Sequence, residues 1–128
     1  MTQTVVGAIL VDEGRVCAAR RTYPPELAGL WEFPGGKVHE GETPAAALRR
    51  ELREELAVEA TIGEQLGTWP IDDRYELRLF LATITSGEPT PDTDHDEVRW
   101  LEADQLETVD WLPSDRAALA TVARGLRR

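Results

Sequence analysis

Three glutamates in one short run are the residues of this sequence best suited to chemistry. Glu51, Glu54 and Glu55 belong to "RRELREEL", and the second and third follow the first by three and four residues. On a helix these spacings place side chains on one face, where like charges destabilise the helix by about 0.2–0.5 kcal/mol per pair. Carboxylate oxygens suit Mg²⁺ and Mn²⁺, and a bound cation would reverse the repulsion. The run therefore indicates a metal site, with a solvated face of mixed arginine and glutamate as the alternative.

A single helix is expected to carry these acids. Thr43 is a suitable N-cap and Pro44 a suitable first helical residue. Leu48, Leu52 and Leu56 recur every four residues and predict a buried stripe. The acids fall in an adjacent sector of about 100° and should border the core. The arginines of the run are expected on the other side of the helix: Arg49, Arg50 and Arg53.

The other elements predict strands that mix with a second helix. Strands are expected over 4–11, 15–19, 58–69, 74–85 and 97–101. A turn at 12–14, a long irregular segment at 20–36 and an acidic loop at 86–96 separate some of them. A last helix is expected over 114–128, with Ser114 as its cap and Gly125 as its stop. This mixture predicts an α/β sandwich around a mixed sheet.

Length and charge narrow the classes of protein. A chain of 128 residues suits one compact domain, expected to span 1–128, and 41 % hydrophobic residues can form a packed core. The net charge of −10 should repel nucleic-acid polymers, although a metal can still recruit small phosphates.

Localisation is expected to be cytoplasmic. No apolar run is long enough to cross a bilayer, and the N-terminal residues do not read as a signal peptide. Cys17, the one cysteine, excludes an internal disulfide and fits a reducing compartment.

The glutamates also belong to a longer pattern of fixed spacing. Residues 36–58 read "GKVHEGETPAAALRRELREELAV". This resembles the Nudix box, the signature of the Nudix hydrolases: Gly, five residues, Glu, seven residues, Arg-Glu-aliphatic, one residue, Glu-Glu, one residue, Gly, aliphatic. Ala57 replaces the last glycine. That departure affects the helix exit, where a left-handed glycine is usual, and not the acidic positions.

The resemblance extends to the segments around the box. "RRTYPPELAGLWEFPGGK" and "VDWLPSDRAAL" are similar to the segments that precede the box and enter the last helix in the MutT subgroup, which includes CTP pyrophosphohydrolases. The similarity covers essentially the whole chain. It implies the Nudix α/β/α sandwich with a central mixed β-sheet.

The resemblance also implies roles for single residues of the box. The carboxylates of Glu51, Glu54 and Glu55 and the carbonyl of Gly35 match the metal ligands. Arg50 matches an arginine that orients the first glutamate of the box by an ion pair, and it joins Glu51 and Glu54 in the expected catalytic set.

Four further positions outside the box carry expected roles. Glu97 matches a catalytic acid that approaches the metal-bound water. Arg21 matches a phosphate-contacting arginine, and Phe33 lies where the base is flanked. Asp115 matches a polar residue that meets the base edge, although it could instead cap the last helix. His95 and His39 are each expected to be a surface histidine, with contact to a metal as the alternative.

The implied reaction is hydrolysis of a nucleoside triphosphate to monophosphate and pyrophosphate, with Mg²⁺ or Mn²⁺ as cofactor. The expected substrates are 8-oxo-dGTP, 8-oxo-GTP, CTP or dCTP, in sanitation of the nucleotide pool. Hydrolysis of a nucleotide sugar or dinucleotide, or non-catalytic nucleotide binding, are the alternatives. The expected partner is a small nucleotide, with no nucleic-acid polymer and no membrane, and the chain is expected to be a monomer or homodimer.

Overall fold

A mixed β-sheet forms the centre of the computed structural model, which describes residues 2–127. Its main path runs in the spatial order β3 (Trp31–Glu32), β2 (Arg15–Arg21), β1 (Gln3–Asp12), β6 (Tyr75–Ser86) and β5 (Glu59–Pro70). β1 is parallel to β6, and the remaining neighbours are antiparallel. Two strands lie off this path: β4 (Gly35–Lys37) pairs with β1, and β7 (His95–Glu102) pairs with β2. The mixed sheet predicted from the sequence is confirmed.

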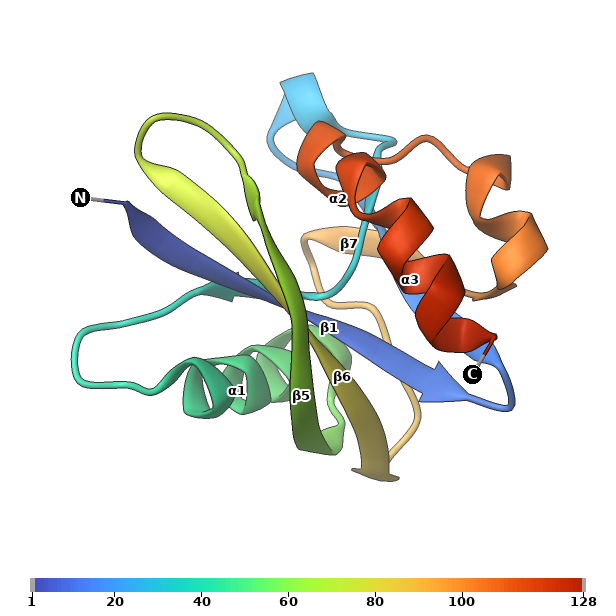
Figure 1. The fold of residues 1–128 in the computed structure, drawn as a ribbon, viewed down its shortest axis with the longest axis horizontal. Coiled ribbons are helices and arrows are strands. Elements are labelled where there is room, and N and C mark those ends of the chain that lie inside the picture. Colours follow the sequence, from blue (N-terminus) through green and yellow to red (C-terminus); the bar gives the residue numbers. More distant parts are fainter. Residues whose placement is uncertain (1, 128) are drawn as a thin grey trace.

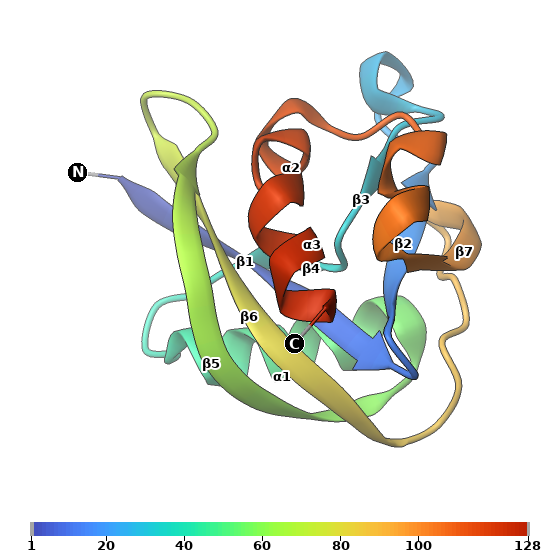
Figure 2. The same cartoon turned by 45° about the vertical axis from the view of Figure 1, so that its right-hand side comes forward.

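Helices cover both faces of this sheet (Figures 1 and 2). α1 (Pro44–Leu56) packs on one face, and α2 (Pro113–Ala117) and α3 (Leu119–Leu126) lie on the other. Two short 3-10 helices, η1 (Pro25–Leu27) and η2 (Ala103–Thr108), complete the described elements. The α/β/α sandwich is therefore confirmed. Among residues 2–127, no helix combines the length and apolarity that a membrane span requires.

β1 supplies both cores because successive side chains of a strand point to opposite faces. Val6, Ala8 and Leu10 pack with the buried leucines of α1. Ile9 packs on the opposite side, in the core that contains Leu119 and Val122 of α3. One strand thus fixes both helical layers relative to the sheet.

α1 begins and ends as its sequence predicts. The Thr43 side chain accepts a hydrogen bond from the N–H of Ala46 at 3.1 Å, and Leu48, Leu52 and Leu56 are fully buried. The chain leaves the helix through Ala57, which adopts the left-handed conformation with φ 58° and ψ 36°. An alanine there costs about 1 kcal/mol. Ala57 therefore keeps the usual geometry of the helix exit without the usual glycine.

The predicted C-terminal helix is wrong in its detail, because two helices replace it. α2 starts at Pro113 with Leu112 as N-cap and no side-chain cap bond, so Ser114 lies inside the helix. Proline fixes the backbone at the first helical position and so sets this start. Ala118 separates α2 from α3, and Gly125 lies within α3 and does not end it.

The segment expected to be irregular, 20–36, is also more regular than predicted. It contains η1 and β3 and the first residues of β4. β3 has only two residues and β4 three, which is too short for an alternating pattern to reveal.

Candidate active site

Gly36 allows α1 to approach β4 closely, and Gly35 allows β4 to approach β1 closely. A Cβ on Gly36 would lie only 2.5–2.7 Å from the carboxyl atoms of Glu51. A Cβ on Gly35 would lie 1.9 Å from the carbonyl oxygen of Val6 in β1. The N–H of Gly35 donates to Glu55 Oε1 at 2.9 Å. The structure therefore brings Gly35 and two of the predicted metal-binding glutamates together, and no side chain other than hydrogen fits at either glycine without displacement.

Arg50 lies beside the acids, which corrects the expectation that it points away from them. Its Nε and Nη2 donate to the two carboxylate oxygens of Glu42, the first glutamate of the box, at 2.8 and 3.0 Å. Its Nη1 donates to Glu51 at 2.8 Å and lies 3.5 Å from Glu54 Oε1. A helical residue is only about 100° from its neighbour, so a long side chain can bend back over it. The hydrogen bonds from Arg50 lower the pKa of Glu42 to about 2.

The carboxylates of α1 differ sharply in environment. Burial, followed by the charge of Glu32, raises the pKa of Glu55 to about 8. Burial also raises the pKa of Glu51, although Arg50 opposes the shift. Glu54 is open to solvent, with 59 % of its side chain exposed. Buried carboxylates that resist ionisation gain from a cation, because the cation stabilises the ionised form. This donor set therefore fits a hard divalent metal ion.

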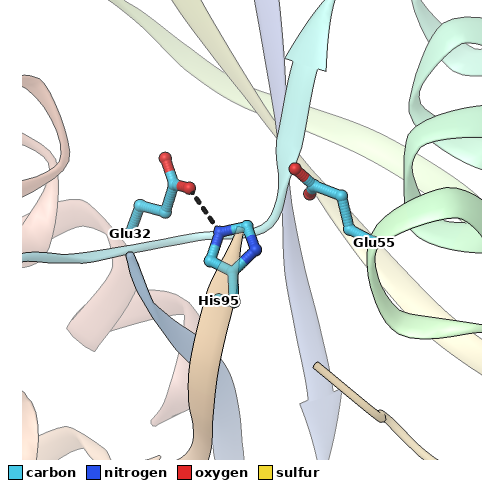
Figure 3. A group of neighbouring side chains, drawn as sticks. All are labelled: Glu32, Glu55 and His95. Atoms are coloured by element: carbon cyan, nitrogen blue, oxygen red, sulfur yellow. Dashed lines mark hydrogen bonds and ion pairs between the residues drawn. The ribbon is translucent and has the colours of Figure 1, made fainter. Parts of the chain in front are cut away.

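Glu55 faces Glu32, which the sequence did not single out, and His95, for which metal contact was only the alternative (Figure 3). Glu32 from β3 and His95 from β7 each offer a ligand atom, and these atoms and one of Glu55 all lie within 4.8 Å of one another. His95 Nε2 is 2.7 Å from Glu32 Oε2, and Nδ1 is 2.9 Å from Asp92 Oδ1. Burial alone would lower the pKa of His95, but the hydrogen bonds to Glu32 and Asp92 raise it to about 9. The expectation of a surface histidine is wrong, because the His95 side chain is 1 % exposed.

The predicted substrate residues line one cavity of about 240 Å³. Arg21, Phe33 and Asp115 border it together with Gly35 and Gly36. The cavity thus opens directly beside β4, which contacts Glu51 and Glu55 of α1. It joins residues from β2, β3, β4 and α2 that are far apart in the sequence.

Asp115 and Phe33 contact each other at this cavity. Asp115 Oδ1 accepts the N–H of Phe33 at 3.1 Å, and the Phe33 ring packs on Trp111 with centroids 4.6 Å apart. Burial raises the pKa of Asp115, which is 5 % exposed, to about 7. Asp115 lies in the first turn of α2, but its bond to Phe33 reaches outside its own helix. A role as helix cap alone does not account for that contact.

Glu97 has a different setting from the one expected. It pairs with Arg20 across β2 and β7, and its carboxylate accepts from Arg99 Nε at 2.5 Å and lies 3.8 Å from Arg20. It is not in the group formed by Glu32, Glu55 and His95 within residues 2–127. The catalytic role of Glu97 stays a prediction, and Glu32 is the described acid outside the box that faces Glu55.

A register shift between β2 and β7 hides the burial of His95 from its local sequence pattern. The sequence predicted a strand at 97–101, whereas β7 begins at His95, and the pairing with β2 shifts between Arg20 and Arg21. The shift interrupts the regular alternation that would have marked His95 as buried. Glu32 did carry a signal, since it stands directly before Phe33 in "WEFPGG".

Comparisons with known proteins agree with this geometry. A family model described as "NUDIX domain" matches residues 1–122. A "Putative 8-oxo-dGTP diphosphatase 2" of Mycobacterium tuberculosis is 42 % identical over 130 residues, which cover 98 % of this chain and 92 % of the relative. A "CTP pyrophosphohydrolase" of Escherichia coli is 50 % identical over 64 residues, covering 50 % of this chain and 47 % of the relative. The crystal structure of a MutT NUDIX hydrolase from Burkholderia pseudomallei superposes with a TM-score of 0.84 at 31 % identity, covering 95 % of this chain and 98 % of that one.

Proposed function

This chain belongs to the Nudix hydrolase family, and we propose that it hydrolyses nucleoside triphosphates to nucleoside monophosphates and pyrophosphate. One observation carries the proposal. The cavity lined by Arg21, Phe33 and Asp115 opens at Gly35 and Gly36 of β4, against which the carboxylates of Glu51 and Glu55 lie. A base, a phosphate chain and a cation therefore have adjacent places.

We assign the metal to the α1 carboxylates. Nudix hydrolases generally use a divalent metal, and Glu51, Glu54 and Glu55 with the carbonyl of Gly35 would hold Mg²⁺ or Mn²⁺ here. Such an ion supplies positive charge against the phosphates and makes a nearby water more acidic.

The protein's own residues supply the remaining tasks. Arg50 fixes Glu42 and Glu51 by direct hydrogen bonds and so limits the positions that the carboxylates can adopt. Arg21 offers a planar donor group for phosphate oxygens. Glu54, which is the most exposed of the three glutamates, has the freedom to reach a water and accept its proton.

The choice of base is assigned to Asp115 and Phe33. An ionised carboxylate only accepts hydrogen bonds, so it favours a base edge that offers N–H groups. Cytosine offers its N4 amine, and 8-oxoguanine offers an N7–H that guanine lacks. Uracil and thymine place a carbonyl at position 4 and should be disfavoured. The relatives named for 8-oxo-dGTP and CTP hydrolysis support these two substrate groups, in sanitation of the nucleotide pool.

Domain organisation, localisation and assembly complete the proposal. We assign residues 1–128 to a single domain, because both described cores share one sheet. Cytoplasmic localisation rests on the lone, buried thiol of Cys17. A monomer or a homodimer stays the expected assembly.

A substrate panel tests the function. Pyrophosphate release with Mg²⁺ is measured for CTP, dCTP, 5-methyl-dCTP, 8-oxo-dGTP, 8-oxo-GTP and the ordinary nucleotides. Release from cytidine or 8-oxoguanine triphosphates is the expected result. Hydrolysis of nucleotide sugars or dinucleotides alone would reassign the chain within the family. Tight nucleotide binding without any hydrolysis would make it a non-catalytic module.

A further inference from the structure

Four side chains form a continuous line that ends at Arg21, which borders the cavity. Asp92 Oδ1 lies 2.9 Å from His95 Nδ1, and His95 Nε2 lies 2.7 Å from Glu32 Oε2. The same Oε2 atom accepts a hydrogen bond from Arg21 Nη1 at 2.7 Å. The line therefore joins the loop before β7 to β2 through the shared oxygen of Glu32.

The centre of this line is closed to solvent. The side chains of His95 and Glu32 are 1 % and 13 % exposed, whereas those of Arg21 and Asp92, at the two ends, are 21 % and 25 % exposed. A hydrogen bond between such buried groups holds its geometry more firmly than one at the surface, because water does not compete for the partners. His95 also has both ring nitrogens in use, so its ring is held from two sides.

Arg21 is left with one edge free. Its Nε donates to the carbonyl of Tyr23 at 2.9 Å and its Nη1 donates to Glu32. Nη2 makes no hydrogen bond to any of residues 2–127, and Arg21 borders the cavity. Two partners thus fix the plane of the guanidinium group while a third donor remains for a ligand oxygen.

We propose that His95 is a positioning residue, which holds Glu32 in place and through it orients Arg21 toward the phosphates of the substrate. The proposal rests on the proposed function, since it gives Arg21 a phosphate partner. His95 itself touches no substrate in this arrangement, because both of its nitrogens already have carboxylate partners. Its effect should be independent of the base.

Two amide substitutions separate the two halves of the line. The amide nitrogen of glutamine can take the place of Nε2, so His95→Gln keeps the bond to Glu32. Asparagine is shorter and takes the place of Nδ1, so His95→Asn keeps the bond to Asp92 and loses the one to Glu32. We expect His95→Asn to lower kcat/KM by about tenfold for every triphosphate, and His95→Gln to retain most of it. Equal effects of the two substitutions, or an effect confined to one base, would overturn the proposal.

A double-mutant cycle tests the route through Arg21. In the Arg21→Ala background there is no guanidinium to orient, so His95→Asn should change kcat/KM by no more than about twofold. A tenfold loss in both backgrounds would show that His95 acts by another route. Asp92→Ala, at the more exposed end of the line, is a milder variant for which a smaller loss of the same kind is expected, and it serves if His95→Asn does not fold.

A control variant for loss of stability is available on the same strand. Val98 is also in β7, but it packs against the α1 side of the sheet, away from the line. Val98→Ala should lower Tm and leave kcat/KM for all bases near that of the wild type. If Val98→Ala reduces kcat/KM as much as His95→Asn at a similar Tm, the effect of His95 is structural and the proposal is wrong.

Binding of inorganic pyrophosphate distinguishes this proposal from the proposed function. The probe reports on the phosphate-binding edge of Arg21 without turnover, and its affinity with Mg²⁺ can be measured by calorimetry. We expect His95→Asn to weaken it and His95→Gln to preserve it. A wild type that binds pyrophosphate but hydrolyses no triphosphate would refute the function alone, whereas unchanged binding in His95→Asn would refute the positioning role.

Discussion

Asp115→Asn should reverse the base preference of this enzyme. In the wild type, Oδ1 of Asp115 accepts the N–H of the Phe33 backbone. The amide oxygen of asparagine can keep that bond, because the backbone N–H still requires an acceptor. The amide NH₂ then occupies the other carboxylate position at the cavity. A group that only accepts is thereby replaced by one that donates.

The size of the effect follows from burial. Asp115 is 5 % exposed, so a mismatched partner at this position cannot be rescued by water. One unpaired buried donor or acceptor costs about 1–3 kcal/mol, which corresponds to roughly tenfold or more in kcat/KM. We expect the CTP/UTP ratio of kcat/KM to fall by at least about tenfold in Asp115→Asn, because the cytosine amine loses its acceptor and the uracil O4 gains a donor.

Asp115→Ala provides the matched comparison. It removes the acceptor for Phe33 as well as the contact to the base, so it should erase the preference without reversing it and should also lower Tm. The assay is pyrophosphate release from CTP and UTP over a range of concentrations. An unchanged CTP/UTP ratio in both variants would refute the reasoning and move base selection to Phe33 and the 23–31 loop.

The remaining predictions concern the metal, the chemistry, the phosphates and pH. Excess EDTA should abolish turnover while the circular dichroism spectrum stays folded; full activity in EDTA would reject the metal site. Glu54→Gln should lower kcat by ~10²-fold or more, because removing this charge removes transition-state stabilisation. Its Tm should be unchanged, because the side chain is 59 % exposed. A kcat near that of the wild type at saturating Mg²⁺ would make Glu54 a surface residue. Arg21→Ala should reduce kcat/KM equally for all bases, and a loss restricted to one base would assign Arg21 to the base. The pKa of Asp115 is raised to about 7, so the carboxyl gains a proton below that pH and can donate. The CTP/UTP ratio should therefore shrink from about pH 8 to about pH 6, and a ratio that is constant over this range would contradict it. Because the folded pKa exceeds the unfolded one, Asp115 also stabilises the fold most at low pH and loses that contribution as pH rises through about 7.

Local signals predicted the helix that carries the chemistry. Thr43, Pro44 and the leucine stripe each act over a few residues, and all three agree on where α1 starts and which face it buries. The conformation of Ala57 could not be read in the same way. The surrounding structure holds an alanine where glycine is intrinsically favoured, which is a tertiary effect.

The missed part of the site depends on contacts between distant residues. The buried His95 contacts Glu32, which lies on another strand and 63 positions away in the sequence. Likewise, Asp115 and Phe33 are 82 positions apart. Composition and periodicity describe neighbours along the chain and do not reveal such contacts. Asp115 was therefore identified only from the family resemblance, and His95, in an acidic stretch, was assigned to the surface.

The alternation of β1 between two cores has a consequence for how this enzyme can change. Glu51, Glu54 and Glu55 lie on α1, whose buried residues belong to one core. Phe33 belongs to the other core, and Asp115 lies in α2, the helix that precedes α3. With the roles proposed here, chemistry and substrate choice lie on opposite faces of the shared sheet. We therefore expect substitutions in the α2–α3 layer to redirect the enzyme to a new base while the residues of the α1 layer stay unchanged. A library for altered selectivity should be confined to that layer, and one for altered metal use to the other.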